Sequence, residues 1–327
     1  MILDYTKEHL RFLKLFAKLT FLIMLAIPRV ASAEIIFEDF YDRPEIEGWV
    51  CADPVPSGYT GKANCPSPST HNGVTRYAGE ITSGGKIGNS LKLWRRNGTD
   101  GTFWRDYHGY LNYTFTEQEF AQGYKELFIR WYVKIPLEWD ADLAGSKTHK
   151  LNRFWIGSSA GATTKEWLID IKGSTFNTGR LSFYNTGGGG VWHTASTVNE
   201  LGINDGNWHS LEWRLKLNST TGSTDGAFQL FVNGEAITIC DGMGQNCATL
   251  QERNVGALTD EYFTTPMPPA IGNLTQGVWD FPTDGWYAFE FDSYVLSTSR
   301  IGHAYGYDNL PIDQLNSPTG LQIIISP

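Results

Sequence analysis

The sequence predicts an all-β protein, built as a two-sheet antiparallel sandwich with few short helices. Short segments rich in aromatic and β-branched residues alternate with clusters of Gly, Asn, Asp, Ser and Pro, the pattern of strands joined by turns. Several segments alternate apolar and polar residues with period two, as expected for antiparallel sheets that pack one face on a core. The 35 Gly, 12 Trp, 15 Tyr and 18 Phe among 327 residues favour the same class.

The first 33 residues are predicted to be a secretory signal peptide. Basic residues precede an apolar run from Leu19 to Ile27, and Ala31-Ser32-Ala33 provides a small-x-small cleavage site. A membrane anchor is the alternative, but this run is far shorter than the roughly 20 residues that cross a bilayer. We therefore expect cleavage after Ala33, a secreted or periplasmic protein, and no membrane association after cleavage.

Charge argues against general nucleic-acid binding. The whole chain has a net charge of −9. Residues 1–33 hold five basic and two acidic residues, so the mature chain keeps 21 basic and 33 acidic residues and a net charge of −12. Nucleic-acid binding needs a basic surface that displaces counterions from phosphates, so no nucleic-acid partner is expected.

Eight segments after the signal peptide are the clearest strand candidates. They are Ser90–Arg95, Glu126–Ile135, His149–Ile156, Trp167–Lys172, Arg180–Tyr184, Trp208–Leu217, Ala227–Val232 and Trp286–Ser297. One short helix is expected near residues 117–123, because Thr116 and Glu119 form a capping-box pattern. No long helical period follows, which disfavours folds that need repeated crossover helices. Residues 34–310 are therefore predicted to form one sandwich, and residues 311–327 a C-terminal linker or tail.

The four cysteines form two close pairs in the sequence, Cys51 with Cys65 and Cys240 with Cys247. In an oxidising compartment such pairs are interpreted as two local disulfides that pin loops. A zinc site made of all four cysteines is the alternative, but its paired ligands are usually separated by only two to four residues. We expect disulfides and no metal.

Three segments together resemble laminin-G and concanavalin A-like sandwiches: Gly206–Trp213, Asp225–Glu235 and Phe291–Gly302. Glu126–Ile135, with Gly145–Trp155 after it, resembles the central strands of secreted jelly-roll polysaccharide lyases. The resemblance implies a concanavalin A-like jelly roll whose partner is a polysaccharide. The same superfamily contains lyases, glycosidases and plain lectins, so the fold alone does not give the function.

The first functional hypothesis is a polysaccharide lyase that cleaves a uronic-acid polymer by β-elimination. This reaction needs a base, an acid and a cation or amide that neutralises the substrate carboxylate. We predict His149 as the base, Tyr132 as acid or base, and Arg130 or Arg153 as the carboxylate clamp, on two strands that could be neighbours. Further substrate-binding residues are predicted from alternating strand positions and from a Gly-rich loop with an aromatic tip. They are Lys134, Lys147, Trp155, Trp192, His193 and Arg214.

Two other functions remain open. A non-catalytic, lectin-like module would bind sugar rings on exposed Trp and Tyr side chains. A glycoside hydrolase would need a pair of carboxylates, for which Glu290 and Asp292 share one strand face. Loops rich in Asp and Asn are compatible with a structural Ca²⁺, but no EF-hand spacing appears, so no cofactor is expected. We expect the mature protein to be a monomer.

Overall fold

The computed structural model describes residues 34–41, 61–62, 69–71, 73–76, 79–96, 111–112, 114–137, 148–172, 179–185, 190–266, 272–273 and 286–306. The chain divides into two units, Met1–Glu34 and Ile35–Pro327. Of the first unit only Glu34 is described, so the fold below is that of the second. The predicted signal peptide and the predicted tail at 311–327 lie outside the described residues and stay predictions.

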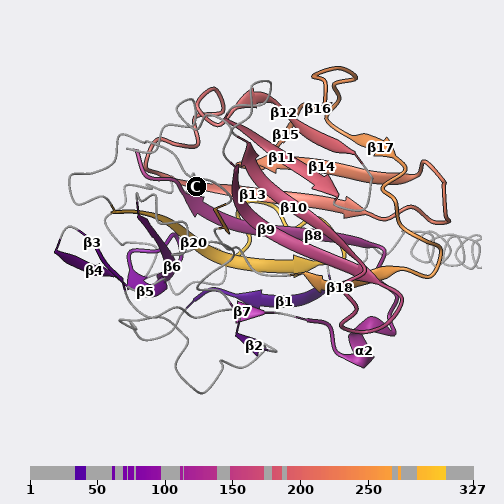
Figure 1. Cartoon of the computed structure of the whole chain (residues 1–327), viewed down its shortest axis with the longest axis horizontal. Helices are drawn as coiled ribbons and strands as arrows, with labels where there is room; N and C mark the ends of the chain where they lie inside the picture. Colours follow the sequence, from indigo (N-terminus) through magenta and orange to yellow (C-terminus); the bar gives the residue numbers. More distant parts are fainter. Residues whose placement is uncertain are drawn as a thin grey trace, which may run out of the picture. The chain divides into compact units, whose positions relative to one another are not determined.

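The larger sheet has nine strands, and its hydrogen-bonded path runs β15-β14-β13-β8-β20-β6-β5, with β1 added to β20 and β17 added to β14 (Figure 1). Its strands are β1 (Ile35–Asp39), β5 (Gly79–Ser83), β6 (Asn89–Arg96), β8 (Glu126–Lys134), β13 (Trp208–Lys216), β14 (Gly226–Val232), β15 (Glu235–Ile237), β17 (Gln251–Arg253) and β20 (Trp286–Ser297).

The smaller sheet has seven strands in the order β16-β12-β11-β10-β9-β18, with β19 also paired to β9. Its strands are β9 (Thr148–Gly157), β10 (Lys165–Lys172), β11 (Arg180–Asn185), β12 (Val191–Thr197), β16 (Ile239–Asp241), β18 (Tyr262–Pro266) and β19 (Gly272–Asn273). Two small ribbons complete the described strands. They are β2 (Gly61–Lys62) with β7 (Leu111–Asn112), and β3 (Ser69–His71) with β4 (Val74–Arg76).

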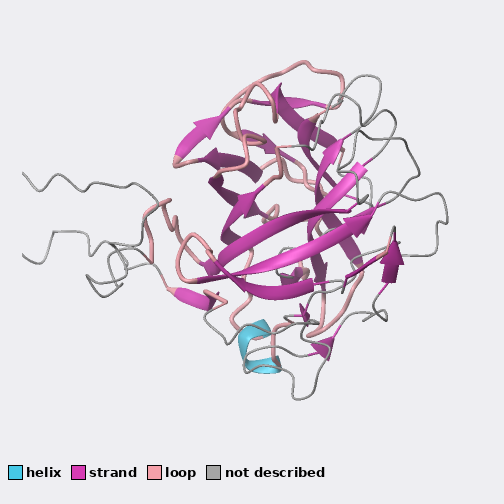
Figure 2. Cartoon of the chain, turned by 90° about the vertical axis from the view of Figure 1, so that its left-hand side faces the viewer, coloured by secondary structure: helices cyan, strands magenta, loops and turns pink. Residues whose placement is uncertain are grey.

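The predicted fold class is confirmed. All recorded strand pairs of both large sheets are antiparallel, and strands dominate the described residues (Figure 2). Each of the eight predicted strands is present within a few residues of its expected ends. The predicted helix is α2 (Glu117–Phe120), and its capping box forms as expected: Thr116 accepts a hydrogen bond from the Glu119 amide, and the Glu119 carboxylate accepts one from the Thr116 amide. Among the described helices, none is long and apolar enough to cross a membrane.

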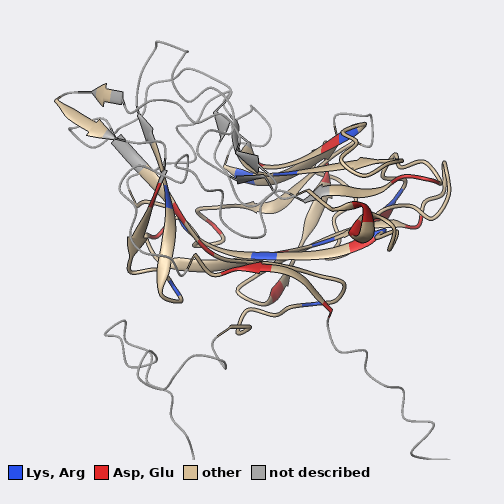
Figure 3. Cartoon of the chain, turned by 90° about the horizontal axis from the view of Figure 1, so that it is seen from below, with Lys and Arg blue, Asp and Glu red and all other residues tan. Residues whose placement is uncertain are grey.

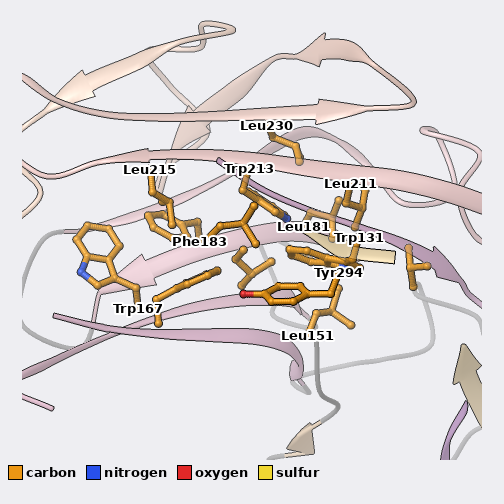
Figure 4. Packing of buried hydrophobic residues seen from close by; sticks show 14 of the residues in the cluster. Trp131, Leu151, Trp167, Leu181, Phe183, Leu211, Trp213, Leu215, Leu230 and Tyr294 are labelled. Atoms are coloured by element: carbon orange, nitrogen blue, oxygen red, sulfur yellow. The ribbon is translucent and has the colours of Figure 1, made fainter. Parts of the chain in front are cut away.

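Aromatic rings from the two sheets join in one buried stack between them (Figure 4). Phe183 of β11 lies face to face with Phe228 of β14, with ring centroids 4.0 Å apart and an interplanar angle of 8°. The stack continues through Trp213 to Trp131 on the nine-stranded sheet and through Trp167 on the seven-stranded sheet. Offset stacking adds to the burial of large apolar surfaces, so this stack ties the sheets together.

The outer face of the nine-stranded sheet is covered in its centre by residues 300–306 of the same chain. The Glu212 carboxylate accepts hydrogen bonds from the amides of Ile301 and Gly302, at 2.6 and 3.0 Å. Arg130 donates to the carbonyl of Tyr305 at 3.0 Å, and the Tyr132 hydroxyl donates to the carbonyl of His303. We call residues 300–306 the covering segment. It removes Arg130, Tyr132 and Glu212 from solvent.

Asp292 on β20 connects this face to the loop before β6. Its Oδ2 accepts a hydrogen bond from the Ile87 amide at 2.6 Å, and its Oδ1 accepts one from the Ser293 hydroxyl at 3.0 Å. Burial raises the pKa of Asp292 to about 8, although these hydrogen bonds and the charge of Arg130 oppose the rise. Between pH 3.8 and about pH 8, the Asp292 carboxyl is therefore protonated in the folded protein and ionised in the unfolded chain.

This raised pKa predicts that the contribution of Asp292 to stability falls as pH rises from about 4 to about 8. Between the ordinary value of 3.8 and the raised value of about 8, the folded state binds more protons than the unfolded state. Asp292 contributes up to about 1.4 kcal/mol per pH unit to that slope. Asp292→Asn keeps an acceptor for Ile87 and removes the titration, so its unfolding free energy should depend less on pH. Urea unfolding of both proteins across this range checks it, and parallel pH profiles would contradict it.

Candidate functional site

The predicted catalytic residues lie on two different sheets. Arg130 and Tyr132 are on β8, whose neighbours are β13 and β20. Arg153 and the backbone of His149 are on β9, whose neighbours are β10, β18 and β19. These two strands, which the sequence left as possible neighbours, lie in different sheets. Consecutive strands along the chain often pair, but here the chain crosses from one sheet to the other between β8 and β9.

Arg130 and Tyr132 are placed on the predicted polar face of β8, but that face is not open. Arg130 is 0% exposed and Tyr132 is 3% exposed. Both side chains donate to carbonyls of the covering segment. A polymer could not reach them while residues 300–306 stay in place, so these contacts assign them a structural role.

Lys134 and Arg214 also lie on the nine-stranded sheet, and both are ion-paired. Lys134 Nζ lies 3.2 Å from Glu290, and Arg214 Nε lies 2.7 Å from Glu126. The carboxylate pair of the hydrolase alternative, Glu290 and Asp292, is on this sheet too. Asp292 is fully buried and Glu290 is paired with lysine, so these two carboxylates do not flank an open site.

Trp192 is a core residue, which corrects its prediction as a substrate-binding tip. It is 2% exposed, and its ring stacks on Trp167 with centroids 6.1 Å apart. The Gly-rich stretch at 186–189 lies outside the described residues, but the Val-Trp-His that follows belongs to strand β12. Alternation along β12 turns Trp192 into the sandwich and the neighbouring His193 to the outer face.

Arg153 and Trp155 lie together on the outer face of the seven-stranded sheet. The Arg153 guanidinium lies 4.4 Å from the centroid of the Trp155 ring, and its Nε donates to Glu166 of β10. The side chain of His149 and all of Lys147 lie outside the described residues, as do Cys51 and Cys65. The roles predicted for these four residues therefore stay predictions.

His193 belongs to a row of side chains that crosses the same outer face. Ser182 of β11 is paired with Asp170 of β10 on one side and with His193 of β12 on the other. His193 is in turn paired with Cys240 of β16. Tyr184, two residues after Ser182, shares the face and is diagonal to His193, a relation that spans about 7–8 Å between Cα atoms. The row thus places a carboxylate, a hydroxyl, an imidazole and a phenol on one face.

A pocket of about 610 Å³ opens at the β16 end of this row. Its lining residues come from β11, β12 and the loop closed by the predicted disulfide. They are Arg180, His193, Ala195, Cys240, Gly242, Met243, Gly244, Gln245 and Cys247. The volume falls within the range of about 300–1,000 Å³ typical of small-ligand sites. None of the described lining residues is acidic, whereas acidic and basic residues are interspersed over the described strands and connections (Figure 3).

The disulfide between Cys240 and Cys247 is confirmed, with Cα atoms 4.0 Å apart. It closes a short loop against the edge of the seven-stranded sheet. Because Cys240 is paired with His193, this covalent link lies directly beside the imidazole. Local cross-links of this kind hold a loop in one conformation, so the disulfide fixes one wall of the pocket.

The surroundings of His193 favour its neutral form. The residue is 3% exposed, and its Nδ1 makes no hydrogen bond with any described residue. Burial lowers the pKa of His193 below its ordinary value of 6.5, and the charge of Arg180 lowers it further, while Asp241 opposes both. A neutral imidazole beside a permanent cation can accept a proton from a substrate that carries a negative charge.

Arg180 is held by backbone carbonyls of β12. Its Nη1 donates to Thr194 at 2.9 Å and also to Ala195. Its Nε and Nη2 make no hydrogen bond to the described residues. Arginine presents its donors in a fixed planar fork that suits a carboxylate, so anchoring through Nη1 leaves a pre-oriented cation at the pocket wall.

Sequence reasoning missed Arg180, Ser182 and Tyr184 as site residues. The signal was present, since these three alternate with the core residues Leu181 and Phe183 along a predicted strand. Their proximity to His193 could not be predicted from the sequence, because it depends on the register in which β11 pairs with β12. Among the described residues, no group of three or more His, Cys, Asp or Glu side chains is placed to hold a metal ion.

No protein-family model and no curated protein matches the sequence. Among solved structures, the chain is similar to the endo-β-1,4-glucuronan lyase from the fungus Trichoderma reesei, with 12% identity and a TM-score of 0.46 over 81% of this chain and 96% of that chain. It is also similar to alginate lyase Aly36B, with 14% identity and a TM-score of 0.39 over 69% and 85%.

The binding domain of botulinum neurotoxin serotype C1 is a third similar structure, with 12% identity and a TM-score of 0.41 over 76% of this chain and 49% of that chain. These comparisons show a likeness of fold alone. At such identities and TM-scores they carry no argument about the activity, which has to come from the residues.

The pKa of His193 should respond to its two charged neighbours in opposite directions. Arg180→Gln removes a positive charge and should raise the pKa, whereas Asp241→Asn removes a negative charge and should lower it. NMR titration of the imidazole carbon protons measures both, with the urea-unfolded chain as the reference. A pKa at or above 6.5 in the folded parent would contradict the assigned environment.

Proposed function

We propose that this chain is an exported polysaccharide lyase that cleaves a uronic-acid polymer by β-elimination at the outer face of the seven-stranded sheet. The observation that carries this proposal is the buried His193 beside Arg180, in a pocket whose described lining residues include no acidic side chain. Export is supported by the predicted signal peptide and by the Cys240–Cys247 disulfide, since disulfides persist in oxidising compartments.

Each requirement of the reaction has a candidate group in this site. Arg180 neutralises the substrate carboxylate, which makes the neighbouring carbon-bound proton more acidic. His193 takes that proton as the base, because its lowered pKa keeps the imidazole neutral at neutral pH. Tyr184 is the candidate acid, since it shares the face with His193 and a phenol can protonate the leaving oxygen.

The proposed reaction balances without a cofactor. The proton leaves C5 for His193, the C5–H electron pair forms the C4–C5 double bond, and the C4–O4 bond breaks. The oxygen of the leaving chain takes a proton from Tyr184, and water returns the two side chains to their starting protonation states. The net result is one new unsaturated uronate end and one new hydroxyl end for each bond broken.

Arg153 and Trp155 lie on the same face as the proposed site, but at a distance from it. The Arg153–Trp155 pair lies on β9, three strands away from His193 on β12. Neighbouring strands are about 4.8 Å apart, so this pair lies on the order of 14 Å from His193. Leu168, Asp170 and Ser182 lie between the two places on this face and are buried, so the proposed reaction is assigned to the pocket alone.

The cleavage test uses the purified protein without residues 1–33, incubated with alginate, glucuronan, a glycosaminoglycan and a neutral glucan. We expect the ultraviolet absorbance of unsaturated uronates to rise with at least one acidic polymer and not with the glucan. His193→Ala should reduce the rate about 10²–10⁴-fold. Arg180→Gln should reduce it about 10²-fold or more, since it removes the cation that stabilises the developing negative charge.

His303→Ala is the matched control, because His303 lies in the covering segment on the other sheet, and it should leave the rate unchanged. New reducing ends without ultraviolet absorbance would show that the enzyme is a hydrolase and not a lyase. Retention of the protein on an acidic polymer, with neither product formed, would show that it is a binding module without lyase activity. A larger loss in Arg214→Gln than in Arg180→Gln would move the site to the nine-stranded sheet.

A further inference from the structure

The loop closed by Cys240 and Cys247 is held unusually firmly for an exposed segment. The Asp241 Oδ1 accepts hydrogen bonds from the amides of Met243 and Gln245, at 3.0 and 2.8 Å, and its Oδ2 accepts one from the Asn246 side chain at 2.6 Å. These hydrogen bonds lower the pKa of Asp241, so its carboxylate stays ionised and keeps its acceptors occupied.

Contacts from the sheet fix the base of the same loop. Gln251 of β17 donates from its side-chain amide to the carbonyls of Ile239 and Asn246, at 2.6 and 2.7 Å. Ile239 and Ala248 form a further antiparallel bridge through two backbone hydrogen bonds. Together with the disulfide, these contacts hold both ends of the loop and its centre.

This rigid loop presents an apolar side chain to solvent. Met243 is 81% exposed, the largest exposure among the large hydrophobic residues in the described part of the chain. Val191, which is 36% exposed, lies next to the loop: a Cβ on Gly242 would lie 3.5 Å from the Val191 Cβ. Met243 differs from the other exposed hydrophobic residues because it lines the pocket, where a bound ligand would contact it.

The pocket also carries one permanent positive charge, that of Arg180. The neutral His193 lines the same pocket, and none of the described residues that line it is acidic. A sugar acid matches both properties, since its ring has an apolar C–H face and its carboxylate carries a negative charge. The polarizable methionine sulfur and methyl groups pack well on such irregular apolar surfaces.

We infer that the Cys240–Cys247 loop forms one wall of a subsite for an acidic sugar residue, with Met243 contacting the ring and Arg180 the carboxylate. This inference rests on the proposed function, because it assigns a substrate subsite to the same pocket. It makes Met243 a specificity-determining residue that acts on binding and takes no part in the proton transfers. The disulfide then serves to keep Met243 in position before substrate arrives.

The test measures binding directly, by calorimetry, in a Tyr184→Phe background that suppresses cleavage. The probes are trisaccharides prepared from alginate and from glucuronan, with cellotriose as the uncharged reference. We expect at least one acidic trisaccharide to bind more tightly than cellotriose. Met243→Ala should weaken that binding about fivefold, through the loss of apolar contact. Met243→Leu should restore most of it, and Met243→Asp should weaken it further by repelling the carboxylate.

Leu258→Ala is the matched control, since Leu258 is another exposed hydrophobic residue that does not line the pocket. It should bind as the parent does. Cys240→Ala/Cys247→Ala should weaken binding at least as much as Met243→Ala, while the circular dichroism spectrum stays that of the parent. Unchanged affinity in Met243→Ala, or no binding of either acidic trisaccharide, would overturn the inference.

The two proposals fail in different ways. If no polymer yields unsaturated uronates but trisaccharide binding still depends on Met243, the lyase activity is wrong and the subsite stands. If polymers are cleaved and the Met243 variants keep the parent affinity and KM, the subsite is wrong and the lyase activity stands.

Discussion

The stacked contact between Phe183 and Phe228 is the interaction on which the rest of the sandwich depends. It joins the two sheets at a centroid distance of 4.0 Å and continues through tryptophans on both sides. The indole N–H groups of Trp131, Trp167, Trp192 and Trp213 are buried there without a hydrogen-bond partner among the described residues. Each unsatisfied N–H group costs about 1–3 kcal/mol. Ring packing and apolar burial must exceed this cost for the stack to be stable.

The same stack decides which side chains face outward on the seven-stranded sheet. With Phe183 and Trp192 turned inward, strand alternation turns Ser182, Tyr184 and His193 outward. A one-residue slip of either strand would exchange the two sets and destroy both the core and the pocket. Core packing and the candidate site are therefore two consequences of one register.

The two outer faces use their polar residues differently. On the nine-stranded sheet, the side chains of Arg130, Tyr132 and Glu212 form hydrogen bonds with the backbone of the covering segment. On the seven-stranded sheet, the edge next to β16 carries a pocket with Arg180 and His193 in its wall. This asymmetry is why a polar strand pattern alone is a poor guide to function: a buried backbone needs polar partners as much as a ligand does.

The sequence by itself determined the fold class, the eight principal strands, the short helix and the Cys240–Cys247 disulfide, because these depend on local pattern and short spacing. It also predicted His193, Arg153 and Trp155, which the structure places on one outer face. Only the tertiary structure decided that Arg130 and Tyr132 are covered, that Trp192 is core, and that Arg180 and Tyr184 share a face with His193. Those outcomes depend on which strands pair across long separations and on where residues 300–306 return to the sheet. Long-range pairing is set by the packing of the whole core, and no local pattern encodes it.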